Sequence, residues 1–307
     1  MEVFKPGIEN WFRSLLSWLG DGYWPEQCTE SPRSVRGPGR TYTLESLLAV
    51  GDVADIYFGT AEGSSGTETQ GQYILKVSRV PGGHALLDIE LKTLASLLAA
   101  AGETTYRKYL PSLVESFPAP GKFPKRVNVF LSEPGFYTLE EVHAQHPALD
   151  GRHLAWIFKR LLTVLGFSHR QHRIHGAVLP CHVMINAASH GLRLVGWGQS
   201  VAKGRPIKTI PTRYRDWFPP EALGTQPAGQ ATDLFLAARC IVYLAGGDPV
   251  TNWMPEAVLQ PLQRFLTTCL LESACMRPDD AWALLEDLDE LLRRQYGRPK
   301  FHELTLT

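Results

Sequence analysis

Arg-Ile-His-Gly-Ala-Val-Leu-Pro-Cys-His-Val-Met-Ile-Asn, residues 173–186, is the stretch from which the rest of the chain can be interpreted. It has the outline of a catalytic loop, but the side chains that would carry the chemistry are absent. Ala177 has no proton acceptor, and the imidazole of His182 is a poorer ligand for a hard cation such as Mg²⁺ than an amide oxygen. The stretch therefore predicts a loop without the usual acid–base and magnesium-binding groups.

Further short motifs precede and follow this loop. They are Tyr73-Ile-Leu-Lys76, Leu192-Arg-Leu-Val-Gly-Trp-Gly198, Pro219-Pro-Glu221, Thr232-Asp-Leu-Phe-Leu-Ala237 and Met276-Arg-Pro-Asp279. Between the first motif and the loop, leucines in residues 86–98 recur at steps of three or four, which predicts a helix with one apolar face. Each motif alone is unspecific. Their joint order resembles the protein kinase-like superfamily, in particular the bacterial-type Ser/Thr protein kinase domain, over about residues 41–296.

The resemblance implies an α+β, two-lobed protein kinase-like fold, with a small antiparallel β-sheet lobe and a larger helical lobe. The small lobe would span about residues 41–134 and the large lobe about residues 135–296. Residues 1–40 are predicted to form an amphipathic helix followed by a Gly/Pro-rich linker, and residues 297–307 a tail.

Three residues are expected at a nucleotide-binding site if the resemblance holds. The stretch from Leu47 to Tyr57 resembles the glycine-rich hairpin that covers ATP phosphates, but of its three glycine positions only Gly51 is glycine. Lys76 would touch the phosphates and pair with Glu90 on the following helix. ATP is therefore the one cofactor that the resemblance leaves open.

The same resemblance assigns no catalytic residue and no metal ligand. The position of the catalytic base is Ala177, and the metal-binding aspartate of the D-F-G motif is replaced by Gly196. His182 stands where the family has a metal-binding asparagine. Mg²⁺ is therefore disfavoured as a cofactor.

The remaining family positions are expected to be structural. Leu94, His175 and Trp197 would stack between the two lobes. Asp233 would bond to the backbone of the loop. Glu221 of the P-P-E motif would pair with Arg277.

These departures favour a pseudokinase, a binding, scaffold or regulatory module that retains at most weak nucleotide binding. The alternative is an atypical ATP-dependent phosphotransferase, or another nucleotide-using transferase, in which Asp52, Glu133 or Asp216 supply substitute metal ligands. An adaptor whose cleft is filled by Trp197 and Leu179 would differ from the pseudokinase only in lacking a ligand.

The composition of the chain limits its expected partners and its expected location in the cell. Thirty-one basic and thirty-one acidic residues among 307 give a formal net charge of zero, so no global field favours nucleic acid. The five cysteines contain no C-x-x-C pair, which disfavours a disulfide framework and predicts a cytoplasmic protein. No apolar run is long enough for a membrane span.

The closely spaced His169, His172 and His175 could suggest a metal cluster with His182, but the family resemblance favours structural roles.

Residues 8–19 are the strongest candidate for a partner-binding element. Their apolar residues share one face of a predicted helix: Ile8, Trp11, Phe12, Leu15, Leu16 and Leu19. Packing against the folded domain is the favoured interpretation. The alternatives are a groove on an unidentified protein partner or a membrane surface, and the scarcity of lysine and arginine disfavours the membrane.

Overall fold

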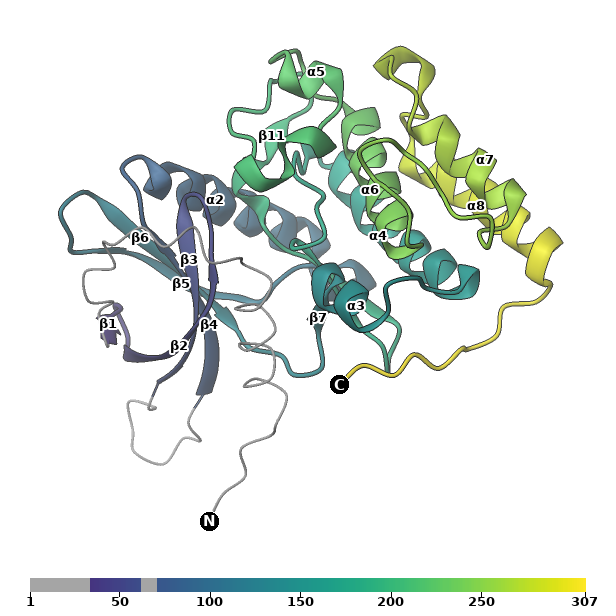
Figure 1. The fold of residues 1–307 in the computed structure, drawn as a ribbon. Coiled ribbons are helices and arrows are strands. Elements are labelled where there is room, and N and C mark those ends of the chain that lie inside the picture. Colours follow the sequence, from purple (N-terminus) through teal and green to yellow (C-terminus); the bar gives the residue numbers. More distant parts are fainter. Residues whose placement is uncertain (1–33, 62–70) are drawn as a thin grey trace, which may run out of the picture.

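The computed structural model describes residues 34–61 and 71–307, so the predicted N-terminal helix lies outside the described residues. The chain folds into a mixed α+β structure with a curled antiparallel sheet on one side and a helical region on the other (Figure 1). The sheet order is β1 (Ser34–Arg36), β2 (Thr41–Val50), β3 (Ala54–Ala61), β4 (Gly71–Ser78), β6 (Lys125–Leu131) and β5 (Leu113–Ala119). Helix α2 (Gly83–Ala101) packs against it.

Alternation of apolar and polar residues explains why these segments form strands with one buried face. In β4, Tyr73, Leu75 and Val77 are all buried, and Val127 and Val129 of β6 join them in one apolar cluster.

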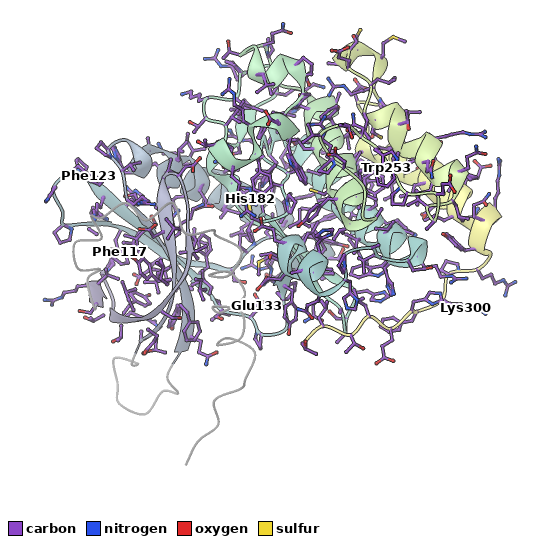
Figure 2. The ribbon with its side chains drawn as sticks, viewed as in Figure 1. Phe117, Phe123, Glu133, His182, Trp253 and Lys300 are labelled. Atoms are coloured by element: carbon purple, nitrogen blue, oxygen red, sulfur yellow. The ribbon has the colours of Figure 1, made fainter. Side chains whose placement is uncertain are left out.

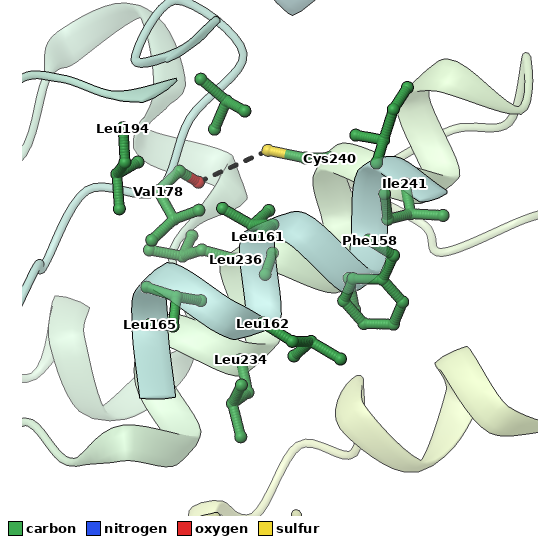
Figure 3. Close-up of a cluster of buried hydrophobic side chains, with 14 of the residues drawn as sticks. Phe158, Leu161, Leu162, Leu165, Val178, Leu194, Leu234, Leu236, Cys240 and Ile241 are labelled. Atoms are coloured by element: carbon green, nitrogen blue, oxygen red, sulfur yellow. Dashed lines mark hydrogen bonds between the residues drawn. The ribbon is translucent and has the colours of Figure 1, made fainter. Parts of the chain in front are cut away.

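The helical region is built around the helices of residues 151–170 and 230–244, whose apolar residues share one core. Its helices are α3 (Leu139–Gln145), α4 (Gly151–Arg170), α5 (Pro220–Leu223), α6 (Gln230–Leu244), α7 (Gln260–Cys269) and α8 (Ala281–Tyr296). Asp150 caps α4 by accepting a hydrogen bond from the backbone N–H of Arg152. Almost all of α6 is buried, and its apolar residues lie beside those of α4 (Figure 3). Inside this core the Cys240 thiol donates to the carbonyl of Val178, at 3.6 Å.

Five short strands complete the region and hold the loop of residues 175–182. Strand β8 (Arg173–Ile174) pairs with β11 (Val201–Ala202), while β9 (Val183–Asn186) pairs with β10 (Gly191–Leu194) and with β7 (Tyr137–Thr138). The loop between β8 and β9 is thus fixed at both ends.

Both ends of the predicted domain differ from the sequence-based boundaries. The linker expected before Thr41 contains strand β1, which pairs with β2, so the folded part includes residues before Thr41. Residues 297–307, expected as a tail, run back to α3, and Leu304 is buried there. Within the described part of the chain, no helix has the length and apolar character needed to cross a membrane.

Candidate functional site

The candidate site lies where the sheet region meets the helical region, and Figure 2 places His182 at this junction. Strand β4 and helix α2 contribute Lys76 and Glu90, and the loop between β8 and β9 contributes Ala177 and His182. The turn after β10 contributes Gly196. The structure therefore brings together residues that the sequence places far apart.

Lys76 and Glu90 form the ion pair that the sequence predicts. Lys76 Nζ lies 3.0 Å from Glu90 Oε1, and the Glu90 side chain is only 2 % exposed. The second carboxylate oxygen accepts a hydrogen bond from the buried Asn128, at 3.0 Å, and Asn128 also donates to the carbonyl of Leu87. Both oxygens of Glu90 are thus engaged, which fixes the position of the lysine ammonium at the junction.

Asp233 anchors the loop by its backbone. Its carboxylate accepts hydrogen bonds from the backbone N–H groups of His175, at 2.8 Å, and Gly176, at 2.9 Å. It also lies 2.9 Å from His169 Nε2, a contact that the sequence analysis did not identify. His169 is one of several buried residues on α4, and nothing in its local sequence distinguishes it as a polar partner.

Gly176 has a structural reason to be glycine. Its φ is +77°, a conformation that disfavours residues with a side chain, and an added Cβ would lie 2.8 Å from the carbonyl oxygen of Gln199. The geometry of the loop therefore requires glycine at this position.

His182 fills the space beside Gly196. The φ of Gly196 is +79°, and an ideal Cβ there would lie 2.5 Å from Cδ2 and 2.7 Å from Nε2 of the imidazole. On its other side the ring donates from Nδ1 to the carbonyl of Ala177, at 2.8 Å. The ring of His182, Gly196 and the backbone carbonyl of Ala177 thus form one packed unit, and a carboxylate at 196 could not enter without displacing the ring.

The imidazoles of His182 and of the neighbouring His175 are held neutral. The pKa of His182 is lowered to about 3, mainly by burial and then by the neighbouring His175 and Lys76, against the opposing effect of the bond to Ala177. Burial also lowers the pKa of His175. The loop therefore presents uncharged rings beside the lysine ammonium.

This burial predicts acid sensitivity. The folded pKa of His182 lies below the ordinary value of about 6.5, so the unfolded state takes up the proton first as pH falls and stability falls with it. At pH 4.5 the expected loss from this group is on the order of 2–3 kcal/mol relative to pH 7.5. His182→Asn, which can still donate to Ala177, is expected to lose that much less between the two pH values, as measured by urea unfolding. Equal losses in both proteins would contradict this account.

The residues expected to stack between the two parts of the fold are all buried. The rings of His175 and Trp197 meet edge to face with centroids 4.5 Å apart, and Leu94 belongs to the same apolar core. Trp197 donates from Nε1 to the carbonyl of Leu194, at 2.8 Å, and His175 Nε2 donates to that of Val195. Both rings are therefore fixed by hydrogen bonds as well as by packing.

Glu221 and Arg277 form the second expected ion pair, with Arg277 Nη2 2.6 Å from Glu221 Oε2. Both side chains are buried, at 0 % and 8 % exposure for Arg277 and Glu221. Thr232 donates to the other carboxylate oxygen, and the guanidinium lies over the ring of Phe235. This pair joins α5 to the segment before α8.

The hairpin that contains Gly51 touches the helical region. Gly51 donates from its N–H to the carbonyl of Ala54, and an added Cβ would lie 2.7 Å from that oxygen. The neighbouring Asp52 accepts a hydrogen bond from the backbone N–H of Thr212, at 2.6 Å. Asp52 therefore links the β2–β3 turn to the segment after β11.

The carboxylates suggested as substitute metal ligands are not gathered into one site. Asp52 is engaged by Thr212, while Glu133 pairs with Arg193 at 2.6 Å. Asp216 is exposed. Among residues 34–61 and 71–307, no group of three or more His, Cys, Asp or Glu side chains is placed to hold a metal ion. The three suggested carboxylates therefore do not form a metal-binding cluster within these residues.

Comparison with known proteins gives no family assignment. No protein-family model matches the chain, and no curated protein matches it in sequence. The geometry of the site is therefore what any functional proposal has to rest on.

Proposed function

We propose that this chain is a protein kinase-like pseudoenzyme that acts as a binding or regulatory module. In this proposal the sheet region is the small lobe of a kinase-type fold and the helical region is the large lobe. The observation that carries the proposal is the packed unit of Ala177, His182 and Gly196, in which an imidazole occupies the space that a metal-binding side chain at 196 would need. Phosphoryl transfer depends on metal ions and a positioned base, and this unit supplies neither.

Weak nucleotide binding without a metal ion is part of the proposal. The support is the Lys76–Glu90 pair, which holds one ammonium group at the junction of the two regions. A lysine so placed can attract a phosphate group. The alternative, an atypical phosphotransferase, has less support because Asp52 and Glu133 are engaged elsewhere.

The first test is the thermal midpoint in millimolar ATP, measured with and without Mg²⁺ or Mn²⁺. A ligand at about 100 times its Kd stabilises the fold by about 2.7 kcal/mol. We expect a shift that is the same with and without metal and that disappears in Lys76→Met. A shift that requires metal, or transfer of labelled phosphate, would overturn the pseudoenzyme assignment. If ATP does not change the thermal midpoint, nucleotide binding is dropped from the proposal and the binding module remains.

A double-mutant cycle tests the packed unit directly. Gly196→Asp is expected to lower the free energy of unfolding by about 1–3 kcal/mol, because its Cβ meets the ring of His182. Adding His182→Asn, a smaller side chain, is expected to restore part of that loss, so the two changes should not be additive. Strict additivity in urea unfolding would show that the ring and position 196 do not compete for space.

A further inference from the structure

Residues 301–307 are bound along the helical region as an extended segment. The imidazole of His190 donates from Nε2 to the carbonyl of His302, and that of His146 donates from Nε2 to the carbonyl of Thr305, both at 2.8 Å. The carbonyl oxygens can only accept, so both rings carry the proton on Nε2. The backbone N–H of Thr307 donates to Gln145 Oε1, also at 2.8 Å.

The segment also contacts the helical region through apolar side chains, of which Leu304 and Leu306 pack into the core while Phe301 stays 62 % exposed. Leu304 is 8 % exposed within the main core, and Leu306 packs against the same core. The ring of Phe301 stacks on one face of His190, at 4.0 Å between centroids, and Trp156 stacks on the opposite face, at 4.3 Å. His190 is thus held between two aromatic rings while it binds the segment's backbone.

These contacts have the chemistry of peptide recognition. The segment forms neither helix nor strand, and hydrogen bonds from the helical region engage its backbone at three positions. Apolar side chains at 301, 304 and 306 supply the sequence-dependent part. Backbone bonds give affinity for any extended chain, and side-chain pockets select among sequences.

We propose that the surface covered by residues 301–307, formed by α3, His146, the first half of α4 and the β9–β10 turn and called the groove below, is a binding site for an extended peptide of a partner protein with the pattern Phe-x-x-Leu-x-Leu. Residues 301–307 occupy this groove as an internal competitor. A partner segment of the same chemistry replaces them and releases the chain's own segment. The site is separate from the Lys76 junction, so the proposal does not depend on nucleotide binding.

The competitor raises the apparent Kd of any partner peptide, because binding requires the groove to be vacated first. Leu304→Asp removes the most buried side chain of the segment and places a charge there. This change leaves every residue of the groove intact. It therefore separates loss of the competitor from loss of the site.

The experiment measures binding of a fluorescent peptide of residues 298–307 to the full chain by anisotropy at pH 7.5. We expect at least about 10-fold tighter binding to the Leu304→Asp chain than to the natural chain. A second release variant, Leu306→Asp, is expected to act in the same direction. Adding His190→Ala to either release variant should weaken binding again, and a control peptide with aspartate at position 304 should not bind.

Hydrogen exchange supplies an independent readout on the natural chain. Excess unlabelled peptide is expected to accelerate amide exchange in the chain's own residues 301–307. The proposal is overturned if the peptide binds neither release variant while both keep a cooperative thermal transition. It is also overturned if the natural chain forms dimers by exchanging this segment, since the occupant would then be a second copy.

Discussion

Replacing Asp233 by alanine is expected to lower the free energy of unfolding by about 3–5 kcal/mol, one of the two largest effects of any single change considered. The carboxylate is fully buried and accepts hydrogen bonds from the backbone of His175 and Gly176 and from the ring of His169. Alanine would leave these donors unpaired inside the core, and each unsatisfied buried group costs about 1–3 kcal/mol. Urea unfolding followed by circular dichroism measures the loss.

Two further variants make this prediction specific. Asp216→Ala removes an exposed carboxylate from the same part of the chain and is expected to change stability by no more than about 0.5 kcal/mol. Asp233→Asn keeps an acceptor oxygen but adds an NH₂ group that faces donors, so its loss should fall between the two. If Asp233→Ala unfolded at the same urea concentration as Asp216→Ala, the anchoring role would be wrong.

The loop contacts of Asp233 show what the motifs of the sequence could predict. Motif order predicts that Asp233 bonds to the backbone of the loop and that Glu221 pairs with Arg277. The structure contains both contacts. The helix that carries Glu90 was expected from leucine spacing, since that pattern is local. Because this helix packs against β4 and β6, Glu90 comes within reach of Lys76 and the two side chains form an ion pair.

Other features depend on contacts that no local pattern records. His182 was expected only as a poor metal ligand, and its competition with position 196 appears once two turns distant in sequence are brought together. Strand β1 lies in a stretch rich in glycine and proline, which favours the prediction of a linker, yet pairing with β2 makes it a strand. The docking of residues 301–307 depends on His146 and His190, which precede that segment by more than a hundred residues.

The buried pair of Glu221 and Arg277 is expected to show the second large effect. Glu221→Gln or Arg277→Met alone should lower the free energy of unfolding by about 3–5 kcal/mol, because each leaves an uncompensated charge in the core. The double variant is expected to lose less than the sum of the two, since no isolated charge remains. A coupling energy of about 2 kcal/mol or more in the urea double-mutant cycle is the expected result.

The exposed pair of Glu290 and Arg294 on α8 is the matched control. Its side chains are 56 % and 72 % exposed, so water screens both charges and replaces the interaction when one partner is removed. The same cycle on this pair should give a coupling of about 0.3–0.5 kcal/mol. If the two couplings were equal, burial would not be what makes the Glu221–Arg277 pair strong. A large coupling at the buried pair alone would show that α5 and the segment before α8 are held together by charge inside the core.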